Sequence, residues 1–575
     1  MDCSRQLQMD AQLQVLSYHL NSEASDVIQP RRSANYKPNI WKYDFLQSLL
    51  TKYDGVEYKL RAEELRENVK AMFVDAQEEL AKLELIDIIR KLGLGDLFAE
   101  ETQKALQAVV SSEKKNKNGG EDLYVTALRF KLLRLHGYEV SQGMNSNYYL
   151  PAYVFEGAFS VTKSTEIKGL LELYEASYLA FQGENILDEA KTFSREALRK
   201  IYSTLDTDIA KEVGHALELS SHWRVQWFDV KWRITVYENS KNIDKRLLEL
   251  AKLNFNTVQA TLQKDLREIS RWWRNLGIME HLNFTRDRLT ESFLCAVGVA
   301  YEPQYSCFRK RLTKITTMIL IIDDVYDVYG YLHELEQFTE AVDRWDSSKI
   351  QQLPECMKIC FQALYNITDE IAYDIQELNG RNVQALQHLR KVWTGFCKAL
   401  FVEAKWYAEG YSPSLEEYLS NALISSGGIV ISVHSMLSLG TDEMIDLLGK
   451  NEDLVYNISI ITRLCNDLGT SVAEKERGDA PSSILCHMRE MNVSEKEAEE
   501  HIKKMISNTW MKINRQCLIS QPPDMLPCSF VKVTVNVARM VHCLYEFGDG
   551  FGVQDGQIRN HICSVLIEPF NHDCL

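Results

Sequence analysis

Two acidic stretches in the second half of the chain carry oxygen-bearing side chains at helical spacing. The first, Asp323-Asp324-Val325-Tyr326-Asp327, directly follows an apolar run over residues 318–322. Residues 323 and 327 are four apart, so on a helix their carboxylates share a face and can bridge a hard cation such as Mg²⁺. Acids beside so apolar a run are costly to bury without compensating charge, which predicts a metal site at the edge of a cavity. For this stretch alone, a solvated helix end that is acidic by chance remains the alternative.

The second stretch is a looser pattern of an amide, a hydroxyl and a carboxylate. Asn466, Thr470 and Glu474 are spaced i, i+4 and i+8, which aligns their oxygens along one side of a helix. Alone, this pattern fits an ordinary polar helix face, but the first stretch gives it weight. Two facing stripes of oxygen ligands would form a clamp, because Mg²⁺ shares its coordination between carboxylates, water and phosphate oxygens. The pair therefore predicts binding of a diphosphate through metal ions.

Fixed positive charge near the clamp is the next requirement for holding a diphosphate. Arg463 lies three residues before Asn466, near the same helix face, where its guanidinium can donate two parallel hydrogen bonds. Arg286 and Arg288 can supply more, although the run Arg286-Asp287-Arg288 fits a surface charge cluster equally well. These arginines are the candidates for the anion-binding part of the site.

The elements that must position these residues are predicted to be long helices. The chain has 575 residues, too many for one ordinary core, with only 27 Gly and 11 Pro against 45% hydrophobic and 25% charged residues. This composition predicts an all-α protein of two helical domains. A polar break over residues 239–244 places the boundary near 242. We expect an extended arm over 1–55, a first helical domain over 56–242 and a catalytic domain over 243–575.

Net charge and segment composition exclude several classes of function. The formal charge of −16 and the lack of a basic run argue against a nucleic-acid partner. No apolar run approaches the roughly 18 residues that a membrane span requires. The 13 Cys include no CxxC pair and fit reduced core thiols. The first thirty residues hold four acids and one Arg, unlike Arg-rich transit peptides, so we expect a cytosolic protein.

Several further motifs, together with the two metal stretches, resemble those of plant terpene synthases of the two-domain class I type. The likeness covers nearly the whole chain, and the combination is specific to that family. The motifs are Arg31-Arg32 with eight residues before Trp41, Leu173-Tyr174-Glu175-Ala176-Ser177, Gly183-Glu184, Leu187-Asp188-Glu189-Ala190, Ser270-Arg271-Trp272-Trp273 and Tyr301-Glu302-Pro303-Gln304-Tyr305. Within the family, residues 31–41 and 293–300 are most similar to members that form α-farnesene.

The resemblance implies an enzyme that ionises a prenyl diphosphate with three Mg²⁺ ions, for which Mn²⁺ can substitute. It implies metal ligation by Asp323, Asp327, Asn466, Thr470 and Glu474, with Asp324 in support. It implies diphosphate binding by Arg286, Arg288 and Arg463. By the same resemblance, Arg31 and Arg32 belong to an arm over the active-site mouth, and Tyr545 and Asp549 to the cavity wall and closing loop. We also expect Asp323→Ala to leave the fold intact, because without metal this acid would have no structural partner.

The resemblance also implies an N-terminal α-barrel-like domain without chemistry. Residues 1–242 contain no DxDD motif, and the nearest match is Asp206-Thr207-Asp208-Ile209. One departure concerns the cavity wall, because many members have Trp where this chain has Cys295. An indole there would stabilise a carbocation through its face, so its loss weakens the case for cyclisation. The alternative is that Cys295 merely packs and that Tyr326, Tyr545 or Phe551 provides the aromatic wall instead.

The expected reaction is ionisation of farnesyl diphosphate and proton loss to an acyclic sesquiterpene such as (E,E)-α-farnesene, catalysed by a monomer. A synthase of β-ocimene from geranyl diphosphate, or of an alcohol of the nerolidol or linalool type by water capture, remains open. A chain-elongating prenyltransferase should carry two full DDxxD motifs, whereas the second stretch here reads Asn466-Asp467-Leu468-Gly469-Thr470. A non-catalytic helical scaffold is the remaining alternative from a different class.

Overall fold

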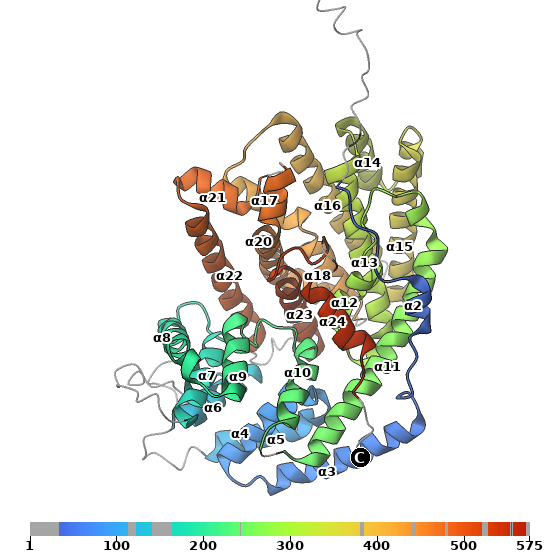
Figure 1. The fold of residues 1–575 in the computed structure, drawn as a ribbon. Helices are drawn as coiled ribbons and strands as arrows, with labels where there is room; N and C mark the ends of the chain where they lie inside the picture. The colour runs from blue at the N-terminus through green and yellow to red at the C-terminus, as the bar shows by residue number, and fades with distance from the viewer. Residues whose placement is uncertain are drawn as a thin grey trace, which may run out of the picture.

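The computed structural model describes residues 31, 34–112, 122–140, 164–241, 243–379, 384–439, 444–477, 481–519, 527–552, 554 and 556–570, without the side chains of 112, 164, 165, 378, 379, 384 and 472–477. All regular elements among these residues are helices, which confirms the all-α prediction (Figure 1). Arg32 and residues 1–30 of the predicted arm lie outside the described part of the chain.

The helices of the first half gather on one side of the molecule (Figure 1). They are α2 (Tyr43–Ser48), α3 (Val56–Asp75), α4 (Glu79–Lys91), α5 (Ala99–Ser112), α6 (Leu123–Leu135), α7 (Ser164–Ser177), α8 (Asn185–Ile201), α9 (Thr207–Glu218) and α10 (Gln226–Glu238), with the short 3₁₀ helices η1 (Gly95–Phe98) and η4 (Tyr202–Thr204). Of these, α2 lies apart from the others, against the bundle formed by the second half.

The second half forms a bundle of long helices around the predicted metal stretches (Figure 1). They are α11 (Lys245–Leu276), α12 (Leu289–Val299), α13 (Ser306–Asp324), α14 (Leu332–Arg344), α15 (Glu355–Asn379), α16 (Gln384–Glu409), α17 (Leu415–Ser425), α18 (Gly428–Leu437), α19 (Met444–Lys450), α20 (Glu452–Arg477), α21 (Ser483–Met491), α22 (Glu495–Leu518), α23 (Cys528–Tyr545) and α24 (Gln557–Ile562). Shorter elements are the 3₁₀ helices η5 (Ile278–Glu280), η6 (Pro303–Tyr305) and η8 (Ser347–Ile350) and the π-helices η7 (Val325–Tyr329) and η9 (Cys563–Ile567).

The long helix α11 connects the two halves. It begins where the Asp244 side chain accepts hydrogen bonds from the backbone N–H groups of Arg246 and Leu247, and it ends at Gly277, whose φ of 63° is the left-handed conformation that Gly adopts at little cost. The boundary predicted at 242 falls between α10 and α11, but one hydrophobic core runs across it. Trp227 of α10, for example, stacks on Phe255 of α11 with ring centroids 5.4 Å apart.

The helix that carries the first metal stretch is almost wholly buried. In α13 every residue from Leu312 to Ile322 is buried, which is what the apolar run before Asp323 predicted. Arg309, with no exposed surface, anchors this helix to α11 by donating to Asp265 over 2.7 Å and to two backbone carbonyls of the α12–α13 connection. This saturated buried pair fixes the register of the helix that presents the acids.

One segment, Leu415–Leu437, is long and apolar enough by composition to cross a membrane, with 61% of its most apolar window buried inside the protein. It is not one continuous helix, because α17 ends at Ser425 and α18 begins at Gly428 after Gly427 adopts a φ of 74°. The burial and the break identify it as a core element of the catalytic bundle, where Ser425, Ser426 and Ile431 line the cavity described next.

Candidate active site

A cavity of about 990 Å³ lies within the helical bundle of the second half. Its walls come from α12, α13, η7, α16, the α17–α18 break, α20 and α23, and it is covered by residues 34–37 and by the segment after α23. A volume of this size can enclose a substrate of several isoprene units. The polar residues collect near one end, and apolar side chains line the remainder.

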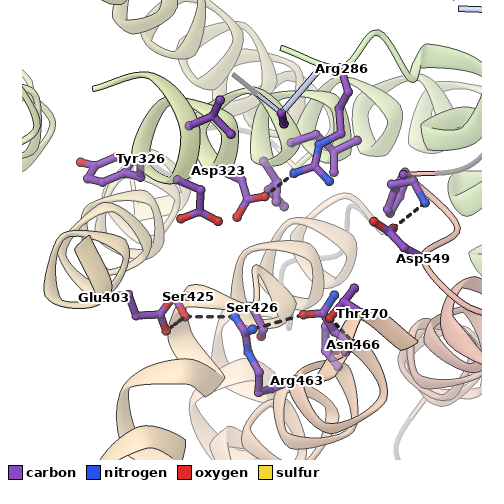
Figure 2. Close-up of a pocket in the computed structure, with 18 of the residues that line it drawn as sticks. Arg286, Asp323, Tyr326, Glu403, Ser425, Ser426, Arg463, Asn466, Thr470 and Asp549 are labelled. Carbon is purple, nitrogen blue, oxygen red and sulfur yellow. Dashed lines mark hydrogen bonds and ion pairs between the residues drawn. The ribbon is translucent and has the colours of Figure 1, made fainter. Parts of the chain in front are cut away.

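One wall of the polar end carries the first acidic stretch. The side chains of Asp323 and Asp327 both line the cavity, as their spacing predicted, and Figure 2 shows Asp323 facing into it. The helix between them is not regular, because α13 ends at Asp324 and the next turn is the wider π-helix η7. Such π-turns are frequent at functional sites. Here the irregular turn still leaves both carboxylates facing the cavity.

Arg286 is the cationic partner of this wall. Its guanidinium donates to Asp323 Oδ2 and, through Nε, to Asp324 Oδ1 over 3.1 Å, while its backbone N–H donates to Asp324 Oδ2 over 2.9 Å. These two carboxylates hold the pKa of Arg286 well above its usual value despite its burial. The expectation that Asp323 has no structural partner was therefore wrong, since Arg286 pairs with it across the cavity edge.

Asp324 differs from its neighbour in both exposure and partners. It has no exposed surface and, besides Arg286, accepts a hydrogen bond from the Tyr36 hydroxyl of the arm over 2.8 Å. Burial raises the pKa of Asp324, and the Arg286 charge opposes that rise. Asp324 is not among the described residues that line the cavity. Its geometry supports an anchoring function toward Arg286 and the arm, while its predicted support of a metal stays a prediction.

The opposite wall is built by α20. Asn466, Thr470 and Arg463 line the cavity, facing Asp323 across it (Figure 2). Arg463 donates from Nη1 to Asn466 Oδ1 over 3.2 Å and from Nη2 to Ser425 Oγ over 3.2 Å. Thr470 donates to the Asn466 carbonyl over 2.8 Å. Glu474 lies in the same helix, but its side chain is outside the described residues, so its predicted ligation stays a prediction.

A glutamate that the sequence reasoning missed also lines this end of the cavity. Glu403 of α16 accepts from Ser425 Oγ over 2.6 Å and from Asn421 Nδ2 over 3.2 Å. Its burial raises the pKa of this carboxyl, and the nearby Arg463 charge opposes the rise. Figure 2 shows Glu403, Ser425 and Arg463 joined in one hydrogen-bonded row. The signal available in the sequence was a lone acid within the apolar stretch Leu400-Phe401-Val402-Glu403-Ala404.

The chemistry of these donors fits hard divalent cations. Asp323 and Asp327 on one wall and Asn466 and Thr470 on the other offer oxygen ligands, and no His is among the described residues that line the cavity. No group of three or more His, Cys, Asp or Glu in the described part of the chain could hold a metal as a closed cage. The arrangement thus suits cations that complete their coordination with water and phosphate oxygens.

The remainder of the cavity is apolar and partly aromatic. Cys295, Tyr326, Tyr545 and Phe551 all line it, so the alternative aromatic wall proposed from the sequence is present. Burial raises the pKa of the Cys295 thiol well above its usual value, which keeps the sulfur protonated and weakly nucleophilic. Other apolar side chains of the wall are Val299, Leu312, Ile319, Leu320, Leu335, Ile431, Val537, Met540, Val541 and Leu544.

Two segments cover the mouth. Residues 34–37 of the arm and Asp549, Phe551 and Gly552 of the segment after α23, here called the closing loop (546–552), line the cavity. Arg31 lies outside the lining, where it donates to both carboxylate oxygens of Glu334 over 2.8 Å and stacks on Tyr329. Arg288 is not among the described lining residues either, and its predicted contact with a diphosphate stays a prediction.

Two helical halves and a cavity with facing oxygen-donor walls are the features of class I terpene synthases, and the chain belongs to the terpene synthase family. Residues 40–217 match the terpene synthase N-terminal domain, and residues 274–512 match the terpene synthase metal-binding domain. The chain is therefore a carbon-oxygen lyase acting on diphosphates, with a domain that binds divalent metal.

Among its relatives, an alpha-farnesene synthase from Ricinus communis is 55% identical over 97% of this chain and 99% of that protein. An (E,E)-alpha-farnesene synthase from Malus domestica is 55% identical over 95% of each chain. Isoprene synthase from Populus x canescens, solved with three Mg²⁺ ions and dimethylallyl-S-thiolodiphosphate, superposes with a TM-score of 0.81 at 41% identity, covering 93% of this chain and 99% of that one.

Proposed function

We propose that this terpene synthase converts farnesyl diphosphate to an acyclic sesquiterpene of the (E,E)-α-farnesene type. The observation that carries the proposal is the pair of facing walls, Asp323 with Asp327 and Asn466 with Thr470, at the polar end of an apolar cavity of about 990 Å³. The full-length similarity to two alpha-farnesene synthases supports the choice of product.

The arginines of the site would bind the diphosphate directly, and the oxygen donors of the two walls would hold metal ions beside it. Asp323, Asp327, Asn466 and Thr470 would hold the divalent metals, which we propose to be three Mg²⁺ ions or Mn²⁺ in their place. When bound, these ions supply positive charge that stabilises the departing diphosphate. Arg463 lies on the same wall and presents its guanidinium to the cavity. Arg286, paired with Asp323, is placed to exchange that partner for a phosphate oxygen.

The apolar wall then protects the allylic cation. Tyr326, Tyr545 and Phe551 offer aromatic surface, and the protonated Cys295 thiol is a poor nucleophile. The strongest base near the cation is the released diphosphate, so we propose that it accepts the proton lost from the carbon next to the allylic cation as the conjugated diene forms. No large group such as an indole fills the position of Cys295, which leaves the chain free to stay extended.

Product analysis tests this proposal. Purified protein with Mg²⁺ is incubated separately with farnesyl and geranyl diphosphate, and the products are separated by gas chromatography. We expect a farnesene as the main product of the first substrate. Turnover of geranyl diphosphate alone would refute the proposal and favour β-ocimene, whereas nerolidol as the main product would favour water capture. The monomeric state and the cytosolic location also stay predictions, to be checked by analytical ultracentrifugation and by imaging a fluorescent fusion.

A further inference from the structure

Next to the two covering segments, a single carboxylate at the start of α12 accepts a hydrogen bond from a residue a short distance beyond each of them. Trp41, at the end of the arm, donates from Nε1 to Glu291 Oε1 over 3.1 Å. Gln554, two residues beyond the closing loop, donates from Nε2 to the same oxygen over 2.8 Å and to Asn39 Oδ1 of the arm over 3.4 Å. Glu291, Trp41 and Gln554 are all buried, and none is among the described residues that line the cavity.

Arg288, the residue immediately before α12, reinforces this connection. Its Nε donates to the Phe551 carbonyl over 2.7 Å and its Nη2 to the Gly552 carbonyl over 3.5 Å, while Nη1 reaches the Lys37 carbonyl of the arm over 3.5 Å. Glu291 and Arg288 also attract one another electrostatically. Arg288 thus contacts both covering segments, and Glu291 contacts a residue just beyond each.

The shared acceptor makes the arm and the loop depend on each other. Glu291 is 1% exposed, and its second oxygen, Oε2, has no hydrogen-bond partner among the described residues. The hydrogen bonds that Trp41 and Gln554 donate to Oε1 therefore take the place of the water that this buried carboxylate would otherwise bind. Loss of either donor leaves that oxygen underbonded and favours conformations in which water enters behind both segments.

We propose that Glu291 is a positioning residue that, with Trp41 and Gln554, fastens the arm to the closing loop and thereby keeps water out of the cavity during turnover. The proposal rests on the proposed function, because water decides the fate of an allylic cation. In a closed cavity the cation loses a proton from carbon and a new C=C bond forms. In an open one, a water oxygen forms the C–O bond, loses its proton to the diphosphate, and an alcohol results.

Hydrogen–deuterium exchange in Trp41→Phe and Gln554→Met tests the connection directly. We expect each variant to raise exchange roughly tenfold in both covering segments, the arm over 34–41 and the closing loop over 546–552. Because both donors act through one acceptor, the double variant should exchange little faster than either single one. An effect confined to the substituted segment, or additive effects in the double variant, would overturn the proposal.

Product composition supplies the second readout. With farnesyl diphosphate in ¹⁸O-labelled water, we expect a several-fold higher fraction of labelled alcohol from both variants. Glu291→Gln, which keeps the acceptor oxygen, should stay near the wild-type fraction, whereas Glu291→Leu should exceed it. Gln263→Met is the matched control, because Gln263 is likewise a buried amide that donates to a carbonyl, that of Leu566 over 2.8 Å, away from both segments.

The two readouts separate this proposal from the proposed function. If the wild-type protein fails to turn over farnesyl diphosphate, the choice of substrate is wrong, but the coupled exchange still tests the connection. If the product is farnesene and the alcohol fraction stays unchanged in all Glu291, Trp41 and Gln554 variants, the positioning role is refuted while the activity stands.

Discussion

The adjacent acids Asp323 and Asp324 should respond oppositely to the same substitution. Asp323 faces the cavity with 29% of its side chain exposed, and Arg286 remains paired with Asp324 when Asp323 is removed. Because a partly exposed ion pair contributes little, Asp323→Asn should lower the free energy of unfolding by less than about 1 kcal/mol. Because Asp323 is a proposed metal ligand, the same substitution should lower kcat/KM by about 10²–10³.

Asp324→Asn should instead destabilise the fold. Asp324 has no exposed surface, and its carboxylate accepts from the Arg286 backbone and side chain and from the Tyr36 hydroxyl. Breaking a buried charge pair costs about 3–5 kcal/mol, and the lower end applies because Asp323 still balances part of the Arg286 charge. We therefore expect a loss of about 3 kcal/mol together with looser attachment of the arm.

The assay pairs urea unfolding, followed by circular dichroism, with kcat/KM from diphosphate release for both variants. We expect a stable, nearly inactive Asp323→Asn and a destabilised Asp324→Asn. Equal destabilisation by the two substitutions, or an Asp324→Asn protein as stable as the wild type, would refute the assignment of separate roles to the two acids.

Three further perturbations have defined outcomes. Cys295→Trp should raise the fraction of cyclic products in chromatography, and an unchanged product spectrum would reject a role for this position in the wall. Gly298→Ala would place a Cβ against Met540, which borders the cavity, so Met540 should move inward. The smaller cavity should lower the ratio of kcat/KM for farnesyl over geranyl diphosphate roughly tenfold, and an unchanged ratio would contradict this. Burial lowers the pKa of His434 to about 4, below its unfolded value of about 6.5, so stability is lost as the pH falls between these values. When the pH is lowered from 7.5 to 5.5, the free energy of unfolding of His434→Leu, measured in urea, should fall by about 1.4 kcal/mol less than that of the wild type. Equal falls in the two proteins would exclude a buried neutral imidazole.

The features that sequence reasoning predicted are those that depend on local spacing. Helical periodicity and composition were sufficient for the all-α class, and the spacing of Asp323 with Asp327 and of Asn466 with Thr470 was sufficient to bring each pair to the cavity. The π-helix that follows Asp324 and contains Asp327 was not predictable, because no residue type in Val325–Tyr329 requires it.

Contacts between residues far apart in the sequence could not be predicted from the spacing of residues within one helix. Arg286 and Arg288 are two residues apart, yet Arg286 lines the cavity while Arg288 donates to carbonyls of the arm and closing loop. Glu403 and Arg463 are connected through Ser425, at the end of α17, which donates a hydrogen bond to Glu403 and accepts one from Arg463. The boundary near 242 follows a polar break in the sequence, but packing of Trp227 on Phe255 continues the core across it.

The most direct test of the facing walls is the position of bound metal. Crystals grown with Mn²⁺ and a thiolo-diphosphate analogue of farnesyl diphosphate allow the ions to be located by anomalous scattering. The account predicts anomalous peaks beside Asp323 and Asp327 and beside Asn466 and Thr470, with the diphosphate between them. Peaks at only one wall, or a diphosphate bound with no metal at either wall, would contradict it.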